Sequence, residues 1–336
     1  MHIQAQLNPV IPSRRTRAPV FVVGCPRSGT TYLYHALLSA GGFAIYRAES
    51  QVFHLLEPRF GDLNSPANRK QLLEAWFQTR LFTATGLDRG AVEEKVMCEC
   101  HNGGDFLRLV MDQMATQQGV KRWAECTPDH VLYLKRIKET IQDALIVHMI
   151  RDGRDVAVSL EKQGWPQQLP WDRMKRRMAA GVFWEWMVHK GREAGKDLGA
   201  DYTEVRYEHL VDNPRSVLND LSSFVGQDLD YDEIQRVAIG SVSRPNTSFH
   251  EEGAAQFAPL GRWKKLYSQE EMRNFENLVG DSLARLSYER STPKQSTGLG
   301  WTIFRAQYKA FFEGKFRIKV QTPLGKFLVT RDLSNM

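Results

Sequence analysis

A short glycine-rich turn near the N-terminus constrains the fold of this chain more than any other feature. The β-branched run APVFVVG (18–24) predicts a buried parallel strand, and TTYLYHALLSAG (30–41) has the leucine spacing of a helix. GCPRSGTT (24–31) joins the two, and strand, turn and helix in this order are the context that a phosphate-binding loop requires. Backbone N–H groups at such a helix N-terminus bind anions whatever the side chains are. The turn therefore predicts an anion site at the end of the first strand.

The residues of this turn disfavour nucleotide hydrolysis. A Walker A loop ends in Lys followed by Ser or Thr, whereas Thr30 and Thr31 stand at those positions here. The nearest cation is Arg27, three positions upstream of Thr30. Without the lysine there is no clamp for β- and γ-phosphates. Arg27 and the neighbouring hydroxyls, including that of Ser28, suit a single terminal anionic group instead.

Strands and helices alternate along the rest of the chain. Further strands are predicted at FAIY (43–46), KRWAEC (121–126), ALIVHMI (144–150) and YTEVRY (202–207), and helices at 67–85, 103–118, 129–141, 171–196 and 214–226. This alternation predicts an α/β fold of the phosphate-loop type, with a mostly parallel β-sheet flanked by helices on both faces. In such sheets ligands bind beyond the carboxyl ends of the strands.

A second motif, IRDGRDVAVS (150–159), follows the most clearly predicted strand. Ser159 lies eight residues after Arg151, about two helical turns, so its hydroxyl returns toward the start of the helix. Arg151 and Ser159 would then form a second phosphate site, separate from the first. Alternatively, the charged residues from 151 to 155 only cap the helix and pair with one another. The residues alone leave both readings open.

Together these motifs resemble those of sulfotransferases that use 3′-phosphoadenosine 5′-phosphosulfate (PAPS). PRSGTT and RDGRDVAVS occur in the order of the family, and WAECTP (123–128), RYEHLVDNP (206–214) and PLGRWKK (259–265) are also similar to its bacterial and protein-tyrosine-sulfating members. The likeness spans roughly residues 18–290. It implies transfer of a sulfuryl group from PAPS to a hydroxyl or amine by in-line displacement, with adenosine 3′,5′-bisphosphate (PAP) as the product and no metal.

The resemblance also implies roles for individual residues. The residues implied around the 5′-phosphosulfate are Arg27, Ser28, Gly29, Thr30 and Thr31. Arg151 and Ser159 are implied to hold the 3′-phosphate, and Tyr207 to lie near the adenine. Arg262 and Lys264 match a late basic segment that closes over the 3′-phosphate.

The reaction needs a base for the acceptor and positive charge on the departing oxygen. Glu49, just past the second strand, resembles the catalytic Glu of the family and is the first candidate for the base, with a capping or salt-bridge carboxylate as the alternative. Glu125, at another strand end, is the second candidate, or orients Arg27 or another cation. Family members often carry W-x-E-K-T-P, whereas Cys126 stands here at the Lys position. Either Arg27 and another cation such as Lys264 then suffice for the leaving group, or catalysis is slow, or the chain is a divergent member of the family.

The positive charge of the chain is concentrated at its C-terminus. The net charge is +6, and residues 291–336 contain eight cations and two anions, so the rest is formally neutral. We expect a flexible basic N-terminal arm (1–17), a sulfotransferase domain (18–290) and a basic C-terminal extension (291–336). WTIFRAQYKAFF (301–312) predicts an amphipathic helix that packs on its own domain with its cations solvated; peripheral contact with a membrane is the alternative.

The cysteines and the N-terminus favour a cytoplasmic protein. Cys25, Cys98, Cys100 and Cys126 are too few for a disulfide scaffold, so reduced structural thiols are expected. CECH (98–101) suggests a metal site, but it lacks the ligand spacing of zinc ribbons, so no metal is expected. There is no apolar run of bilayer length and no pattern typical of a signal peptide.

Two other classes of function stay open on the sequence. The first is a phosphate-loop kinase-like phosphotransferase, opposed by the missing lysine and by the lack of an evident Mg²⁺-binding Asp after a strand. The second is a non-catalytic protein that binds polyanions through its basic tail. Nucleic acid is not expected as a partner. The acceptor, whether a small molecule, carbohydrate, lipid or peptide, and the oligomeric state are not encoded in any motif.

Overall fold

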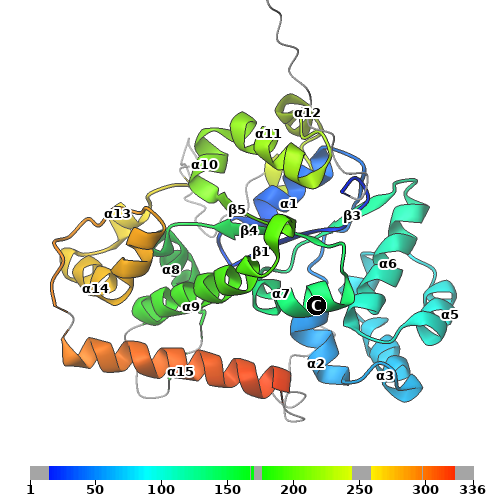
Figure 1. Cartoon of the computed structure of the whole chain (residues 1–336), viewed down its shortest axis with the longest axis horizontal. Coiled ribbons are helices and arrows are strands. Elements are labelled where there is room, and N and C mark those ends of the chain that lie inside the picture. The colour runs from blue at the N-terminus through cyan, green and yellow to red at the C-terminus, as the bar shows by residue number, and fades with distance from the viewer. Residues whose placement is uncertain (1–14, 167, 170–175, 244–258, 297, 322–336) are drawn as a thin grey trace, which may run out of the picture.

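The computed structural model describes residues 15–166, 168–169, 176–243, 259–296 and 298–321. Five strands form one parallel sheet in the order β2-β3-β1-β4-β5 (Figure 1). The strands are β1 (Val20–Gly24), β2 (Phe43–Ala44), β3 (Arg122–Glu125), β4 (Leu145–Ile150) and β5 (Tyr202–Arg206). The predicted mostly parallel α/β fold is confirmed, and β1, which feeds the glycine-rich turn, lies in the middle of the sheet.

Helices cover both faces of the sheet (Figure 1). They are α1 (Thr30–Ser39), α2 (Glu57–Phe60), α3 (Pro66–Trp76), α4 (Arg80–Thr83), α5 (Arg89–Glu99), α6 (Gly103–Gln117), α7 (Leu134–Thr140), α8 (Gly153–Lys162), α9 (Arg176–Lys196), α10 (Tyr207–Asp212), α11 (Pro214–Val225), α12 (Tyr231–Val237), α13 (Trp263–Leu266), α14 (Gln269–Arg285) and α15 (Leu299–Gln321). A π-helical turn at Val52–Leu56 and 3₁₀ turns at Pro128–Tyr133, Gly199–Asp201 and Gly240–Val242 complete the described elements.

Strand β1 explains why the sheet is covered on both sides. Successive side chains of a strand point to opposite faces. Val20 and Val22 pack into the core beneath α1 and α11, whereas Phe21 and Val23 belong to the larger core beneath α9 and α15. All four side chains are fully buried. The unbroken apolar run of this strand is therefore required, because neither face meets water.

Several boundaries differ from the sequence prediction. Strand β2 has two residues instead of four, and the helix expected at 67–85 is divided into α3 and α4. Thr79 causes the division, because its hydroxyl accepts a hydrogen bond from the Phe82 N–H and caps a new helix. The helix expected from 129 begins as a 3₁₀ turn, and α5 was not predicted. The helix expected at 171–196 is described from Arg176, and 170–175 lie outside the described residues.

Helix α15 packs along α9, as predicted for the amphipathic segment (Figure 1). Phe304, Tyr308 and Phe312 are buried in the larger core. The side chains of Arg305 and Lys309 stay 37% and 40% exposed, and both also pair with the buried carboxylate of Glu185 at 2.6 and 2.9 Å. Burying a carboxylate is costly unless it is paired, so these cations contribute to the docking of the helix.

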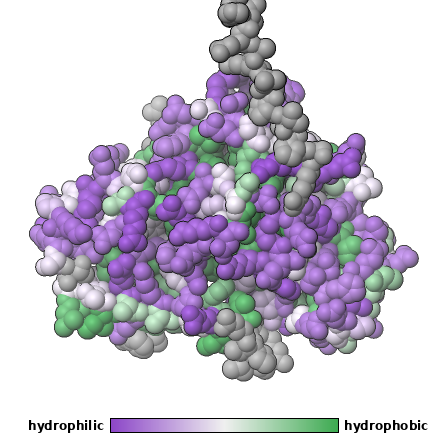
Figure 2. All heavy atoms as spheres, in the orientation of Figure 1, coloured by the Kyte–Doolittle hydropathy of each residue, from purple (hydrophilic) through white to green (hydrophobic). Residues whose placement is uncertain are grey.

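The N-terminal end of α15 carries an exposed apolar patch. Leu299 is 76% exposed and Ile303 47% exposed. Figure 2 shows this patch at the lower edge of a surface that is otherwise mostly hydrophilic. In the part of the chain that the structure describes, no helix is both long and apolar enough to cross a membrane.

Candidate active site

The glycine-rich turn lies between the end of β1 and the start of α1, as the sequence predicts. Gly29 precedes the helix with φ of 91°, in the left-handed region that favours glycine. A Cβ atom on Gly29 would lie 2.2 Å from Cδ2 of Tyr207, so the ring of Tyr207 packs directly on the backbone of the turn. Only glycine meets both conditions at this position.

Arg27 links the turn to the second motif. It adopts φ of 74°, which is unusual for a residue with a side chain. Its Nε donates a hydrogen bond to Oγ of Ser159 at 3.0 Å, across 132 residues of sequence. Nη1 of Arg151 donates to the carbonyl oxygen of Arg27 at 3.1 Å. The two predicted phosphate sites are therefore neighbours that share hydrogen bonds, closer together than the sequence alone implied.

The hydrogen bonds of Arg151 go to neutral groups, and the carboxylate of Asp155 lies 3.8 Å from its Nη2. Its Nη2 donates to the carbonyl of Pro259 at 2.6 Å, and its guanidinium lies 4.5 Å from the ring centre of Tyr207. The indole N–H of Trp184 donates to the carbonyl of Arg151 at 3.1 Å, which fixes the backbone from α9. Nε of Arg151 and Oγ of Ser28 are both buried without a hydrogen-bond partner among the described residues. Unpaired buried polar atoms are rare, so this end of the site is prepared for further polar partners.

A cavity of about 390 Å³ opens where these groups meet. We call it the arginine cavity, and its lining is Pro26, Arg27, Gly29, Thr30, Thr31, Tyr32, Glu49, Pro128, Arg151, Trp165, Tyr207, Val211, Pro214, Tyr231, Gln235, Ser241, Val242 and Pro259. Its volume falls in the range typical of small-molecule sites. It brings together most of the predicted site residues; Ser28 and Ser159 are buried beside it and touch its lining through the turn and through Arg27.

Positive charge is concentrated at this cavity. The pKa of Arg27 is lowered, first by burial and then by the charges of Arg151 and Arg262, while the carboxylate of Glu49 acts in the opposite direction. Arg262 also acts electrostatically on Tyr207, so its charge reaches both walls of the cavity. Mutually repelling guanidinium groups around one cavity favour the binding of an anion.

Lys264 does not share this position. It is exposed, and its Nζ lies 5.7 Å from the ring centre of Trp263, outside the lining of the arginine cavity. Trp263 itself stacks on Arg154, with 3.9 Å between the guanidinium carbon and the ring centre. Of the two basic residues predicted in this segment, Arg262 is therefore the one whose charge lowers the pKa of Arg27.

The two candidate bases occupy different environments. Glu49 is exposed, lines the cavity, and accepts a hydrogen bond from Nε2 of Gln51 at 2.6 Å. Glu125 is fully buried, and its two oxygens accept hydrogen bonds from Ser50, Thr127 and His130. Burial would raise the pKa of Glu125, but the charge of His130 and these hydrogen bonds hold it below its usual value.

Glu125 fixes the turn that carries Glu49. Its Oε1 accepts hydrogen bonds from both the backbone N–H and the hydroxyl of Ser50, at 3.3 and 2.8 Å. The N–H of Gln51 donates to Oγ1 of Thr127 at 3.2 Å. The residues on either side of this turn are thus tied to the end of β3, and the basic residue beside the Glu125 carboxylate is His130 rather than Arg27.

Cys126 introduces no charge near the cavity. The thiol is buried, and burial together with Glu125 and Glu49 raises its pKa well above the usual value. It therefore stays protonated and neutral. The cysteines of the described chain are all free, and no group of three or more His, Cys, Asp or Glu residues there could hold a metal ion.

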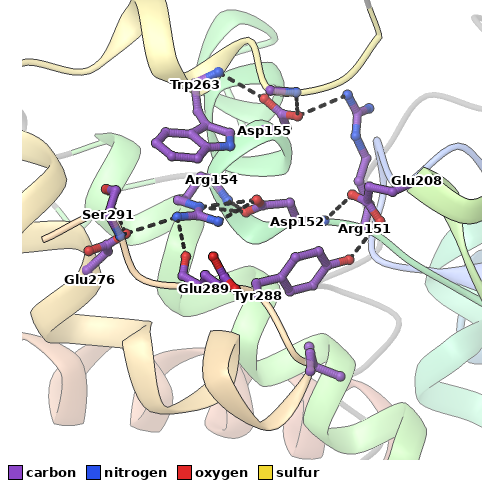
Figure 3. Close-up of polar contacts among 12 residues, drawn as sticks. Arg151, Asp152, Arg154, Asp155, Glu208, Trp263, Glu276, Tyr288, Glu289 and Ser291 are labelled. Atoms are coloured by element: carbon purple, nitrogen blue, oxygen red, sulfur yellow. Dashed lines mark hydrogen bonds and ion pairs between the residues drawn. The ribbon is translucent and has the colours of Figure 1, made fainter. Parts of the chain in front are cut away.

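The residues of the second motif divide between the two readings that the sequence left open, a phosphate site and a capped helix start. Arg151 faces the arginine cavity, whereas the residues after it build the start of α8 (Figure 3). Asp152 caps the helix at the N–H of Arg154 and pairs with the Arg154 guanidinium at 2.8 Å. Arg154 also pairs with Glu276 of α14 at 3.0 Å. Arg151 therefore lines the cavity, whereas Arg154 forms buried ion pairs with Asp152 and Glu276.

Sequence reasoning missed several residues of the cavity. Trp165 is 44% exposed at the cavity, and Tyr231 and Gln235 reach it from α12. The sequence indicates Trp165 only weakly, as a large aromatic residue between a predicted helix and a proline. Tyr231 and Gln235 had none, because only the packing of α12 on α1 brings them to the turn.

Comparison with known proteins gives one family and several distant structural likenesses. The model of the sulfotransferase family matches residues 19–232, well over half of the chain. The sulfotransferase domain of the Synechococcus PCC 7002 olefin synthase is 17% identical with a TM-score of 0.46, over 90% of this chain and 97% of that one. Sulfotransferase STF9 from Mycobacterium avium is 14% identical with a TM-score of 0.45, over 84% of this chain and 79% of that one.

A retinol dehydratase in complex with androsterone and the inactive cofactor PAP is 16% identical with a TM-score of 0.38, over 85% of this chain and 84% of that one. No curated protein matches the chain. The structural likenesses are too distant to add to the family match. That match includes both arginine motifs, which meet at one cavity at the carboxyl ends of β1 and β4. The chain therefore belongs to the sulfotransferase family.

Proposed function

We propose that the protein transfers a sulfuryl group from PAPS to a hydroxyl or amine of an acceptor. The observation that carries the proposal is the meeting of the two motifs at one cavity, where Arg27 donates to Ser159 and receives a hydrogen bond from Arg151 on its carbonyl oxygen. A ligand with phosphate groups at two positions of one nucleoside suits a cavity with neighbouring arginines from two strands. Residues 18–290 would form the catalytic domain.

The residues of the arginine cavity fit this nucleotide. The turn from Arg27 to Thr31 would hold the 5′-phosphosulfate through its backbone N–H groups and hydroxyls, and the partnerless Oγ of Ser28 suits an anionic oxygen. Arg151, Ser159 and Arg262 would hold the 3′-phosphate, and the partnerless Nε of Arg151 is one donor for it. Tyr207, packed against the turn, would meet the adenosine.

Glu49 would act as the general base. It is the carboxylate that lines the cavity among the described residues, and Gln51 holds one of its oxygens. It would take the proton of the acceptor while the acceptor oxygen or nitrogen forms a bond to sulfur and the bond from sulfur to the phosphate oxygen breaks. Glu125 is assigned a supporting role, because its oxygens are occupied by hydrogen bonds that fix the turn of Glu49.

Arg27 would stabilise the charge that develops on the departing phosphate oxygen. A fixed guanidinium in a partly buried site stabilises such charge without reorganisation of water. With a neutral thiol at Cys126, Arg151 and Arg262 are cations whose charges act on Arg27 and that could share this role. The proposal requires no metal.

Binding experiments separate this function from the two alternatives. PAP should raise the thermal unfolding midpoint of the full chain, whereas ATP with Mg²⁺ should not, because the turn lacks the lysine of a Walker A loop. A shift with ATP and Mg²⁺ alone would support the kinase-like reading. No shift with either nucleotide would leave the polyanion-binding reading and overturn the proposal.

The role of Glu49 is tested by Glu49→Gln. This variant should lose at least about 100-fold in sulfuryl transfer, the usual scale of general-base catalysis, while binding PAP as the wild type does. Labelled PAPS and a cell extract provide the assay, and identification of the labelled product gives the acceptor. Glu139→Gln, an exposed glutamate that pairs with Arg136, is the control. Near-normal transfer by Glu49→Gln would move the base elsewhere.

The remaining expectations complete the proposal. The acceptor is proposed to be a small molecule, carbohydrate, lipid or peptide, and the working location the cytoplasm. Peripheral membrane contact through the C-terminal segment is the least supported part, because Arg305 and Lys309 are directed to Glu185.

A further inference from the structure

We propose that Asp155 is a positioning residue that holds Arg262 beside the arginine cavity. This inference rests on the proposed function, since it concerns how the 3′-phosphate end of that site is built. Asp155 does not line the cavity; it acts through the backbone of residues 261–263, which are more than 100 positions away in the chain.

The carboxylate of Asp155 accepts backbone hydrogen bonds on both sides of Arg262. Its Oδ2 accepts the N–H of Gly261 at 2.8 Å, and its Oδ1 accepts the N–H of Trp263 at 2.9 Å (Figure 3). The Asp155 side chain is only 2% exposed, so water competes little for these hydrogen bonds. Two bonds to the residues that flank Arg262 fix the point from which its side chain starts.

The rest of the second motif holds the same segment from below. Arg154 stacks on the ring of Trp263 at 3.9 Å, and Nη2 of Arg151 donates to the carbonyl of Pro259 at 2.6 Å. Arg154 is in turn anchored by Asp152 and by Glu276 of α14 (Figure 3). Each charged side chain from 151 to 155 except Asp152 thus contacts the segment 259–263 directly.

The segment is positioned so that the charge of Arg262 acts on the cavity. That charge lowers the pKa of Arg27 and, like the charge of Arg151, acts to lower the pKa of Tyr207. Holding the backbone on both sides of Arg262 limits how far this cation can move away from its neighbours. Asp155 supplies the hold, and its distance of 3.8 Å from Nη2 of Arg151 makes it a weaker partner of that side chain than of the two N–H groups.

A double-mutant cycle tests the inference with PAP and adenosine 5′-monophosphate (AMP) as probes. Arg262→Ala and Asp155→Asn should each weaken the affinity for PAP by roughly tenfold, the effect of losing one charge-assisted contact, and should change the affinity for AMP less than about twofold. The double variant should bind PAP no more weakly than Arg262→Ala alone, because Asp155 acts through Arg262. Asp281→Asn, which breaks an exposed pair with Lys294, should change neither affinity.

Two results would overturn the inference. Additive losses in the double variant would mean that Asp155 acts independently of Arg262, and equal losses for PAP and AMP would mean that Asp155→Asn damages the cavity as a whole. Failure of the wild type to bind PAP would instead refute the proposed function, so the two failures are distinguishable.

Amide hydrogen exchange gives a check on the wild-type protein, should Asp155→Asn not fold. The N–H groups of Gly261 and Trp263 should exchange at least about tenfold more slowly than unprotected amides in the nucleotide-free protein, because each is hydrogen-bonded to a buried carboxylate. Exchange of both at the rate of an unprotected loop would show that the carboxylate does not hold the segment.

Discussion

Two clusters of cations in this molecule have opposite surroundings. Under α15, Arg305 and Lys309 both meet the buried carboxylate of Glu185. At the arginine cavity, Arg27 donates to a hydroxyl, and Arg151 donates to carbonyl oxygens, lies over an aromatic ring and has the Asp155 carboxylate 3.8 Å from its Nη2. Cations hydrogen-bonded to a buried carboxylate are neutralised and hold the fold together, whereas cations whose hydrogen bonds go to neutral groups keep more of their charge available for a ligand.

The largest difference between the clusters should appear at Arg27. Arg27→Ala should lower sulfuryl transfer by roughly 1,000-fold, the scale observed when a charge-stabilising donor is removed from an active site. Its unfolding midpoint should change by less than about 2 °C, because no carboxylate is left unpaired in a buried site. Arg27→Lys, which keeps a cation, should recover part of the activity. Transfer within tenfold of the wild type by Arg27→Ala would contradict the contrast.

The reverse pattern is expected at Glu185. Glu185→Ala should lower the free energy of unfolding by about 1–2 kcal/mol, because α15 loses its charge-assisted hydrogen bonds while the cations left behind are more than a third exposed. Urea unfolding measures this loss, and PAP affinity of the folded variant should stay within about twofold. Asp281→Ala, at an exposed pair, should change stability by less than about 0.5 kcal/mol. The distinction fails if the two variants are equally stable.

Arg151 refines the comparison within the cavity. Arg151→Ala should weaken PAP by about 100-fold but AMP by less than tenfold, since charge-assisted contacts to the 3′-phosphate are removed. Isothermal titration with both nucleotides measures the ratio. Arg176→Ala, on the exposed start of α9, should leave both affinities unchanged. Equal losses for the two nucleotides would remove Arg151 from the 3′-phosphate site.

The smallest expected effect is the acid response of the Glu185 cluster. Burial would raise the pKa of Glu185, but hydrogen bonds from Arg305, Ser282 and Lys309 outweigh it and hold the pKa below its usual value. A lowered folded-state pKa gives stability that is complete above the unfolded value of about 4.3 and is lost as the pH falls through the folded value. The stability difference between wild type and Glu185→Gln should therefore shrink between pH 6 and pH 3, and a constant difference would contradict this sign.

The sequence predicted the elements whose signals are local. The β1–turn–α1 unit, β4 and the sheet type follow from apolar runs, glycines and alternation, and the structure confirms them. The prediction that Arg27, Arg151 and Tyr207 belong to one site came from motif resemblance, and all three line the arginine cavity.

Contacts between distant segments could not be predicted in the same way. Nothing near Asp155 indicates that its partners are the N–H groups of Gly261 and Trp263, and nothing near Glu125 indicates that it fixes the turn at Ser50. The placement of Lys264 at the nucleotide stays a prediction; its side chain is exposed beside Trp263, outside the lining of the arginine cavity. Motifs name side chains, but the direction in which they point depends on packing.

The cysteine at position 126 affects how the charge of the cavity depends on pH. With that thiol protonated, the titratable groups among the described lining residues are arginines, tyrosines and Glu49. Of these only a carboxylate changes charge below about pH 9. Cys126 therefore leaves the charge of the cavity unchanged in the alkaline range where an active-site lysine would lose its proton.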